Sequence, residues 1–92
     1  MKEEYACSSK YAWRKMEEKV LILDTTAGDY FLLNETASLI WEGLLSQQEP
    51  REICRTLVEA YELSEEKALR DVKELIQRLK AERFLVVSRV EI

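Results

Sequence analysis

The chain has 92 residues, of which 47% are hydrophobic and 35% are charged, and its net charge is −4. This length allows one domain with a modest core and little room for an elaborate active site. The apolar content excludes an intrinsically disordered protein, and the acidic pI near 4.9 argues against a protein that meets nucleic acid with a basic face.

Several kinds of protein are excluded by what the sequence lacks. No apolar run approaches the roughly 20 residues that a membrane span needs, and the start of the chain lacks the apolar core of a secretory signal. We therefore expect a cytoplasmic protein with no membrane partner. There is no histidine, no phosphate-binding glycine loop and no nucleophile elbow. These absences predict a protein that is not an enzyme and that holds no cofactor and no metal.

Three short segments in the first third of the chain predict strands. Residues 11–15 alternate weakly between apolar and polar, residues 20–24 form a short apolar run, and residues 30–33 suit a half-buried strand. Residues 25–29 contain Gly28 and predict the hairpin connection into the last of these strands. Because a small antiparallel sheet is marginal alone, it must dock on the helices that follow.

The last of these strands runs without a break into a predicted helix. Asn34 is a favoured N-cap, and Glu35 complements the positive end of the helix. The apolar residues then recur at helical spacing: Ala37, Ile40, Trp41, Leu44 and Leu45. The strand therefore lies against helices and can keep one edge free. A free apolar edge is either an aggregation liability or a place where another peptide adds as a strand.

Two more helices follow. The second opens near Pro50, and its apolar face is formed by Ile53, Cys54, Leu57, Val58 and Tyr61. The third is capped by Ser64 and carries Glu65 and Glu66 in its positive first turn. Its core stripe consists of Ala68, Val72, Leu75 and Leu79. Residues 84–87 form a final apolar run, either a strand that closes the sheet or a tail beneath the third helix.

The two cysteines, Cys7 and Cys54, are too far apart in the sequence to form a recognisable metal or redox motif. Cys54 lies on an apolar helix face, which predicts a buried structural thiol. We expect Cys7 to be exposed.

One flank of the third helix is more apolar than a single core seam requires. Leu69 and Ile76 lie to one side of the core stripe, and Lys73 and Lys80 lie just beyond them. These residues either broaden the contact with the sheet or form the wall of a groove. In the second case the two lysines would attract acidic residues of a bound peptide, although a lysine flank is often only a solvated helix face.

The order of these segments resembles the PqqD-like proteins, small elements that recognise the leader peptides of ribosomally made, post-translationally modified peptides. The resemblance is carried by residues 20–24, Gly28, residues 30–37, Ile40, Trp41, Glu42, Ile53, Leu57, Tyr61, Ala68, Asp71, Val72 and Leu79. It implies an α+β, winged helix-turn-helix-like fold, in which an antiparallel sheet of about three strands precedes three helices. We expect residues 1–92 to form one such domain, with a core spanning about 11–87.

The resemblance also implies a function and a site. In the family, the leader segment adds to the third strand of the sheet and lies in a groove against the third helix. Carried over to this chain, the receiving strand comprises Asp29, Tyr30, Phe31, Leu32 and Leu33, and the helix wall comprises Leu69, Val72, Lys73, Ile76 and Lys80. The implied partners are a precursor peptide and a separate leader peptidase or peptide-modifying enzyme. A lasso peptide pathway is favoured over a radical-SAM enzyme.

Two readings from other classes remain at this point. A winged helix can bind DNA, but residues 64–82 contain five acidic and five basic side chains and so carry no net charge. Alternatively, the apolar strand edge could pair two copies of the chain. We expect a monomer that binds no nucleic acid.

Overall fold

A computed structural model describes residues 2–90 of the chain, with side chains described for residues 3–88. The elements follow in the order β1 (Lys2–Cys7), β2 (Tyr11–Met16), β3 (Lys19–Asp24), β4 (Tyr30–Leu32), α1 (Glu35–Leu45), α2 (Pro50–Tyr61), α3 (Glu65–Ala81) and β5 (Leu85–Val90). The α+β class and the order of three predicted strands before three helices are confirmed.

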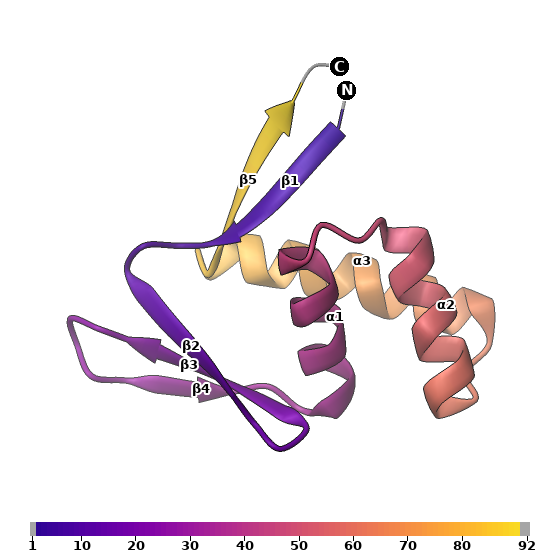
Figure 1. Ribbon diagram of the computed structural model, residues 1–92, viewed down its shortest axis with the longest axis horizontal. Coiled ribbons are helices and arrows are strands. Elements are labelled where there is room, and N and C mark those ends of the chain that lie inside the picture. The colour runs from indigo at the N-terminus through magenta and orange to yellow at the C-terminus, as the bar shows by residue number, and fades with distance from the viewer. Residues whose placement is uncertain (1, 91–92) are drawn as a thin grey trace.

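The strands form two separate antiparallel sheets. The predicted sheet has the order β2-β3-β4, and a second sheet pairs β1 with β5. In Figure 1 the β1–β5 ribbon projects away from the helices, and both ends of the chain lie near its tip. The sequence predicted neither β1 nor this pairing. Of the two alternatives for residues 84–87, the strand is confirmed, but it pairs with β1 and does not close the three-stranded sheet.

Each helix begins where its capping residue predicts. The side chain of Asn34 accepts a hydrogen bond of 2.8 Å from the Ala37 N–H at the start of α1. Ser64 accepts one of 3.2 Å from the Lys67 N–H at the start of α3. Pro50 is the first residue of α2. Local chemistry therefore fixes where α1 begins, and only two residues separate it from the end of β4.

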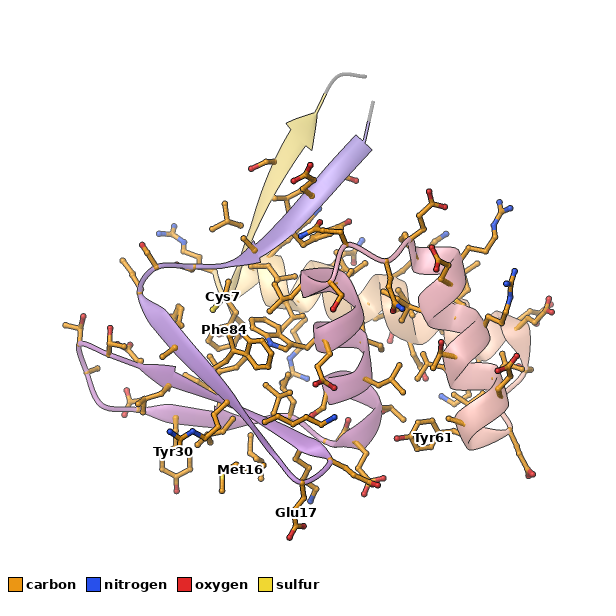
Figure 2. All side chains as sticks on the ribbon, viewed as in Figure 1. Cys7, Met16, Glu17, Tyr30, Tyr61 and Phe84 are labelled. Carbon is orange, nitrogen blue, oxygen red and sulfur yellow. The ribbon has the colours of Figure 1, made fainter. Side chains whose placement is uncertain are left out.

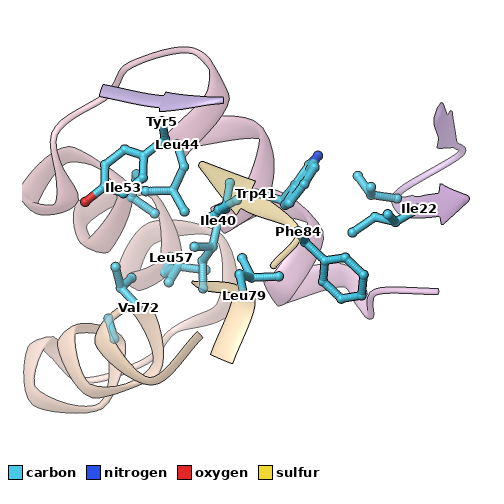
Figure 3. Close-up of a cluster of buried hydrophobic side chains, with 13 residues drawn as sticks. Tyr5, Ile22, Ile40, Trp41, Leu44, Ile53, Leu57, Val72, Leu79 and Phe84 are labelled. Carbon is cyan, nitrogen blue, oxygen red and sulfur yellow. The ribbon is translucent and has the colours of Figure 1, made fainter. Parts of the chain in front are cut away.

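The core joins β1, β3, β5 and all three helices. Trp41, Leu57 and Leu79, which were predicted to be core, are at most 2% exposed. The full set of buried apolar residues is Tyr5, Val20, Ile22, Ile40, Trp41, Leu44, Ile53, Leu57, Ala68, Val72, Leu79, Phe84 and Leu85. Figure 3 shows Phe84 between the sheet and the helical part of this cluster. This packing holds α3 against the side of α1 and places its last turns near β4.

A buried hydroxyl fastens α1 to the three-stranded sheet. Ser38, which is 1% exposed, accepts a hydrogen bond of 2.7 Å from the Val20 N–H. The same hydroxyl donates to the Leu33 carbonyl at 3.2 Å. The hydroxyl thereby bridges the Val20 N–H and the Leu33 carbonyl, which would otherwise bond directly to each other in the ladder between β3 and the end of β4. This bridge fixes β4 relative to α1.

The turn that leads into β4 is organised by one carboxylate. Asp24 accepts hydrogen bonds from the N–H groups of Thr26 and Ala27, at 2.9 and 3.0 Å. These bonds from Ala27 and Thr26 lower the pKa of Asp24. Gly28 follows with a φ of 80°, a conformation that favours glycine. The hairpin predicted over residues 25–29 is therefore confirmed.

Both cysteines are free thiols, and both are partly buried. The expectation that Cys7 is exposed is wrong, because its Sγ packs 3.6 Å from the Ser8 carbonyl oxygen and 3.7 Å from that of Tyr11. Burial raises the pKa of the Cys7 thiol. Cys54 is less buried than predicted, and burial raises the pKa of its thiol as well. Neither thiol is therefore activated.

Candidate functional site

β4 is an edge strand whose outer backbone groups point away from the sheet. Asp29 and Leu33 both bond to β3, since the Asp24 N–H donates to the Asp29 carbonyl at 2.8 Å and the Leu33 N–H to the Val20 carbonyl at 2.9 Å. Backbone polar groups alternate in direction along an antiparallel strand. The N–H and C=O groups of Tyr30 and Leu32 therefore face the open side of β4.

The side chains of β4 are exposed although all three are apolar or aromatic. Tyr30 is 69% exposed, Phe31 40% and Leu32 57%. Phe31 pairs with the buried Ile22, so it faces the helices, and its ring lies 4.8 Å from that of Phe84. Tyr30 and Leu32 face the other side of the sheet, and in Figure 2 Tyr30 points away from the helices. Both faces of the strand therefore carry accessible apolar surface.

A groove of about 540 Å³ lies between β4 and the last turns of α3. Its lining residues come from β4 and the start of α1 on one side and from α3 and the turn after it on the other. They are Tyr30, Phe31, Leu32, Leu33, Asn34, Ala37, Leu75, Arg78, Leu79, Glu82 and Phe84. A groove that borders an unpaired strand edge can accept an extended peptide.

The structure brings together only part of the predicted site. Residues 30–33 line the groove, whereas Asp29 does not. Val72 is 0% exposed and belongs to the core, so the expectation that it forms part of a groove wall is wrong. It packs where a ligand has no access.

The other four predicted wall residues do not line the groove either. Leu69 is 43% exposed, and Ile76 is half-buried against the core. Lys73 and Lys80 are exposed. The positive charge of Lys73 opposes the rise that burial causes in the pKa of the Cys54 thiol. This flank of α3 therefore lies outside the groove, with its lysines exposed to solvent.

The groove uses the opposite flank of α3. With 3.6 residues per turn, Leu75, Arg78 and Glu82 lie on the far side of the core stripe from Ile76 and Lys73. Sequence reasoning placed Leu75 in the core and singled out neither Arg78 nor Glu82 as site residues. A helical wheel displays both flanks, but it cannot say which of them faces β4. The sequence alone does not indicate which flank lines the groove; the position of β4 in the folded chain does.

The described residues contain neither a metal-binding cluster nor a membrane-spanning helix. In residues 3–88, no three side chains of the types that ligate metals come together in a group that could hold an ion. None of the helices described is both long and apolar enough to cross a membrane.

Comparison with protein families decides the relationship. The model of the family described as coenzyme PQQ synthesis protein D (PqqD) matches residues 19–85. The chain belongs to the PqqD family. The match begins at β3 and ends at the first residue of β5, so it includes β4, α3 and the groove between them.

Solved structures resemble this PqqD-family chain over nearly its whole length. One is described as lasso peptide synthetase B1 complexed with the leader peptide; it is 28% identical, the match covers 90% of this chain and 98% of that one, and the TM-score is 0.81. Another is TbiB1 in complex with the TbiA(beta) leader peptide, at 23% identity, with 99% and 100% coverage and a TM-score of 0.76. Because the identity to TbiB1 is only 23%, this second match shows a shared fold and nothing more. No curated protein matches the chain.

Proposed function

We propose that this chain binds the leader segment of a ribosomally made precursor peptide, which adds as a strand to the open edge of β4. The observation that carries the proposal is the unpaired backbone of Tyr30 and Leu32 beside a groove with aromatic, aliphatic and charged lining residues. Main-chain hydrogen bonds hold an extended ligand without demanding one sequence, and the groove selects side chains. The proposed site comprises residues 30–33 and the α3 flank of Leu75, Arg78 and Glu82.

The pathway we favour is lasso peptide biosynthesis. The relative described as lasso peptide synthetase B1 is complexed with a leader peptide and shares 28% identity with this chain over 90% of its length. Membership of the PqqD family supports the same reading. In this role the chain performs no chemistry. It delivers the leader to a separate leader peptidase or modifying enzyme.

A proline at position 32 tests the strand-addition step. Proline has no N–H, so Leu32→Pro removes the donor that faces the open side of β4 and leaves the bonds of Leu33 and Asp29 to β3 in place. We expect binding of a cognate leader peptide to weaken by about 1–2 kcal/mol, roughly five- to thirtyfold. The affinity can be measured by calorimetry.

Leu32→Ala is the matched control, because it truncates the same side chain and retains the N–H. Thermal unfolding of both variants verifies that the fold is kept. If the proline and alanine variants bind the leader equally well, the peptide does not add to β4 and the proposal is wrong.

A further inference from the structure

The groove contains one cation and one anion. Of its eleven lining residues, only Arg78 and Glu82 are charged. The other polar side chain of note, Asn34, already accepts hydrogen bonds from Ala37 and Thr36 as the cap of α1. Any recognition of a charged ligand side chain in the groove therefore falls to these two residues of α3.

Both side chains are available to a ligand. Arg78 and Glu82 are exposed, and among the described residues the ion pairs are Lys15 with Glu42 and Lys67 with Asp71. No hydrogen bond joins the side chain of Arg78 or Glu82 to another described residue. They are four positions apart with the cation first, which is the weaker orientation for pairing within a helix.

Their spacing matches that of a strand. Four residues of α-helix advance by about 6 Å, and two residues of a strand advance by about 6.6–6.8 Å. Side chains two positions apart point to the same face of a strand. A peptide on the β4 edge thus presents its alternate, groove-facing side chains at nearly the interval that separates Arg78 from Glu82.

The direction of the peptide decides which charge comes first. The sheet is antiparallel throughout, so an added strand that continues the pattern runs opposite to β4. In Figure 1 β4 leads toward α1, whereas α3 crosses the picture the other way, toward β5. The added strand then runs in the same sense as α3 and passes Arg78 before Glu82.

We propose that Arg78 and Glu82 fix the register of the bound peptide by pairing with an acidic residue and with a basic residue two positions later. This inference rests on the proposed strand addition at β4. It names the class of peptide that the groove prefers, namely one with the order acidic, any residue, basic on its groove-facing side. Because the pairs are exposed, each is of modest strength and weakens as salt screens it.

A display library of random 15-residue peptides tests the proposal. Peptides are selected on the full chain at low salt, and those whose binding is lost in Leu32→Pro are retained as β4 binders. Among them we expect the order acidic-x-basic to exceed basic-x-acidic by roughly three- to tenfold, since two exposed ion pairs act together. The double variant Arg78→Glu with Glu82→Arg should reverse this preference.

The double variant Lys73→Glu with Glu74→Lys is the matched control. It exchanges charges on the same helix, keeps the net charge and leaves the groove unaltered, so the wild-type preference should persist. If β4 binders show no preferred order, or the same order after the Arg78/Glu82 exchange, the register pair is overturned while strand addition stands. If the selection yields no β4 binder, strand addition fails and the register pair fails with it.

Discussion

The two flanks of α3 are alike in composition and differ in what lies opposite them. One carries Leu75 with Arg78 and Glu82 and faces β4; the other carries Ile76 and Lys73 and lies outside the groove. Each combines half-buried apolar residues with exposed charges. The contrast teaches that the neighbour of a helix face, here an unpaired strand edge, determines whether that face lines a groove, and that its own residue types do not.

The largest expected effect separates the core stripe from the flanks. Leu79 is 2% exposed, so Leu79→Ala should lower the free energy of unfolding by about 2–5 kcal/mol through the cavity that it leaves. Leu69 is 43% exposed, and Leu69→Ala should cost about 0.5 kcal/mol or less. Urea unfolding measures both. Equal losses would show that the outer flank is part of the core.

The next effect distinguishes the two flanks by binding. Leu75 and Ile76 are both half-buried against the core, so Leu75→Ser and Ile76→Ser should destabilise the fold to a similar degree. Only Leu75 lines the groove, and its loss should weaken leader binding by about 1 kcal/mol, roughly fivefold. Affinities are compared at a temperature where both variants are folded. A greater binding loss for Ile76→Ser would reverse the assignment of the flanks.

The smallest effect concerns charge. Arg78→Glu should slow the association of an acidic leader at low salt and change its salt dependence, because exposed charges at a binding site act mainly on the rate of encounter. Lys73→Glu makes the same change in net charge outside the groove and should slow association less. Stopped-flow measurement gives both rates. Equal slowing would mean that only the net charge of the chain matters and that Arg78 has no special role in the encounter.

Much of the fold was predictable because local chemistry determines it. Asn34, Pro50 and Ser64 mark the helix starts, and Gly28 marks the hairpin before β4. The β1–β5 sheet was not predictable in this way. It joins residues 2–7 to residues 85–90, so its pairing depends on the folded chain and not on a turn, and residues 2–7 lack the apolar run that marks β3.

The candidate site likewise has one part that local sequence predicts and one part that only the folded chain determines. Residues 30–33 could be predicted as a strand with a free edge, because an apolar strand that leads directly into a capped helix can keep one edge unpaired. Their proposed role as the receiving strand came from the resemblance to PqqD-like proteins. The flank of α3 that lines the groove could not be predicted, because the choice between Leu75 and Ile76 depends on how α3 is rotated about its axis. That rotation is set by packing around Val72 and Leu79, which is tertiary information.

Amide hydrogen exchange at β4 tests the central claim most directly. On titration with the leader, the N–H groups of Tyr30 and Leu32 should become strongly protected, because they gain hydrogen bonds to the added strand. Those of Phe31 and Leu33 face β3 and should change little. This alternation is the result that the account predicts. Tight leader binding that leaves the exchange of Tyr30 and Leu32 unchanged would contradict it.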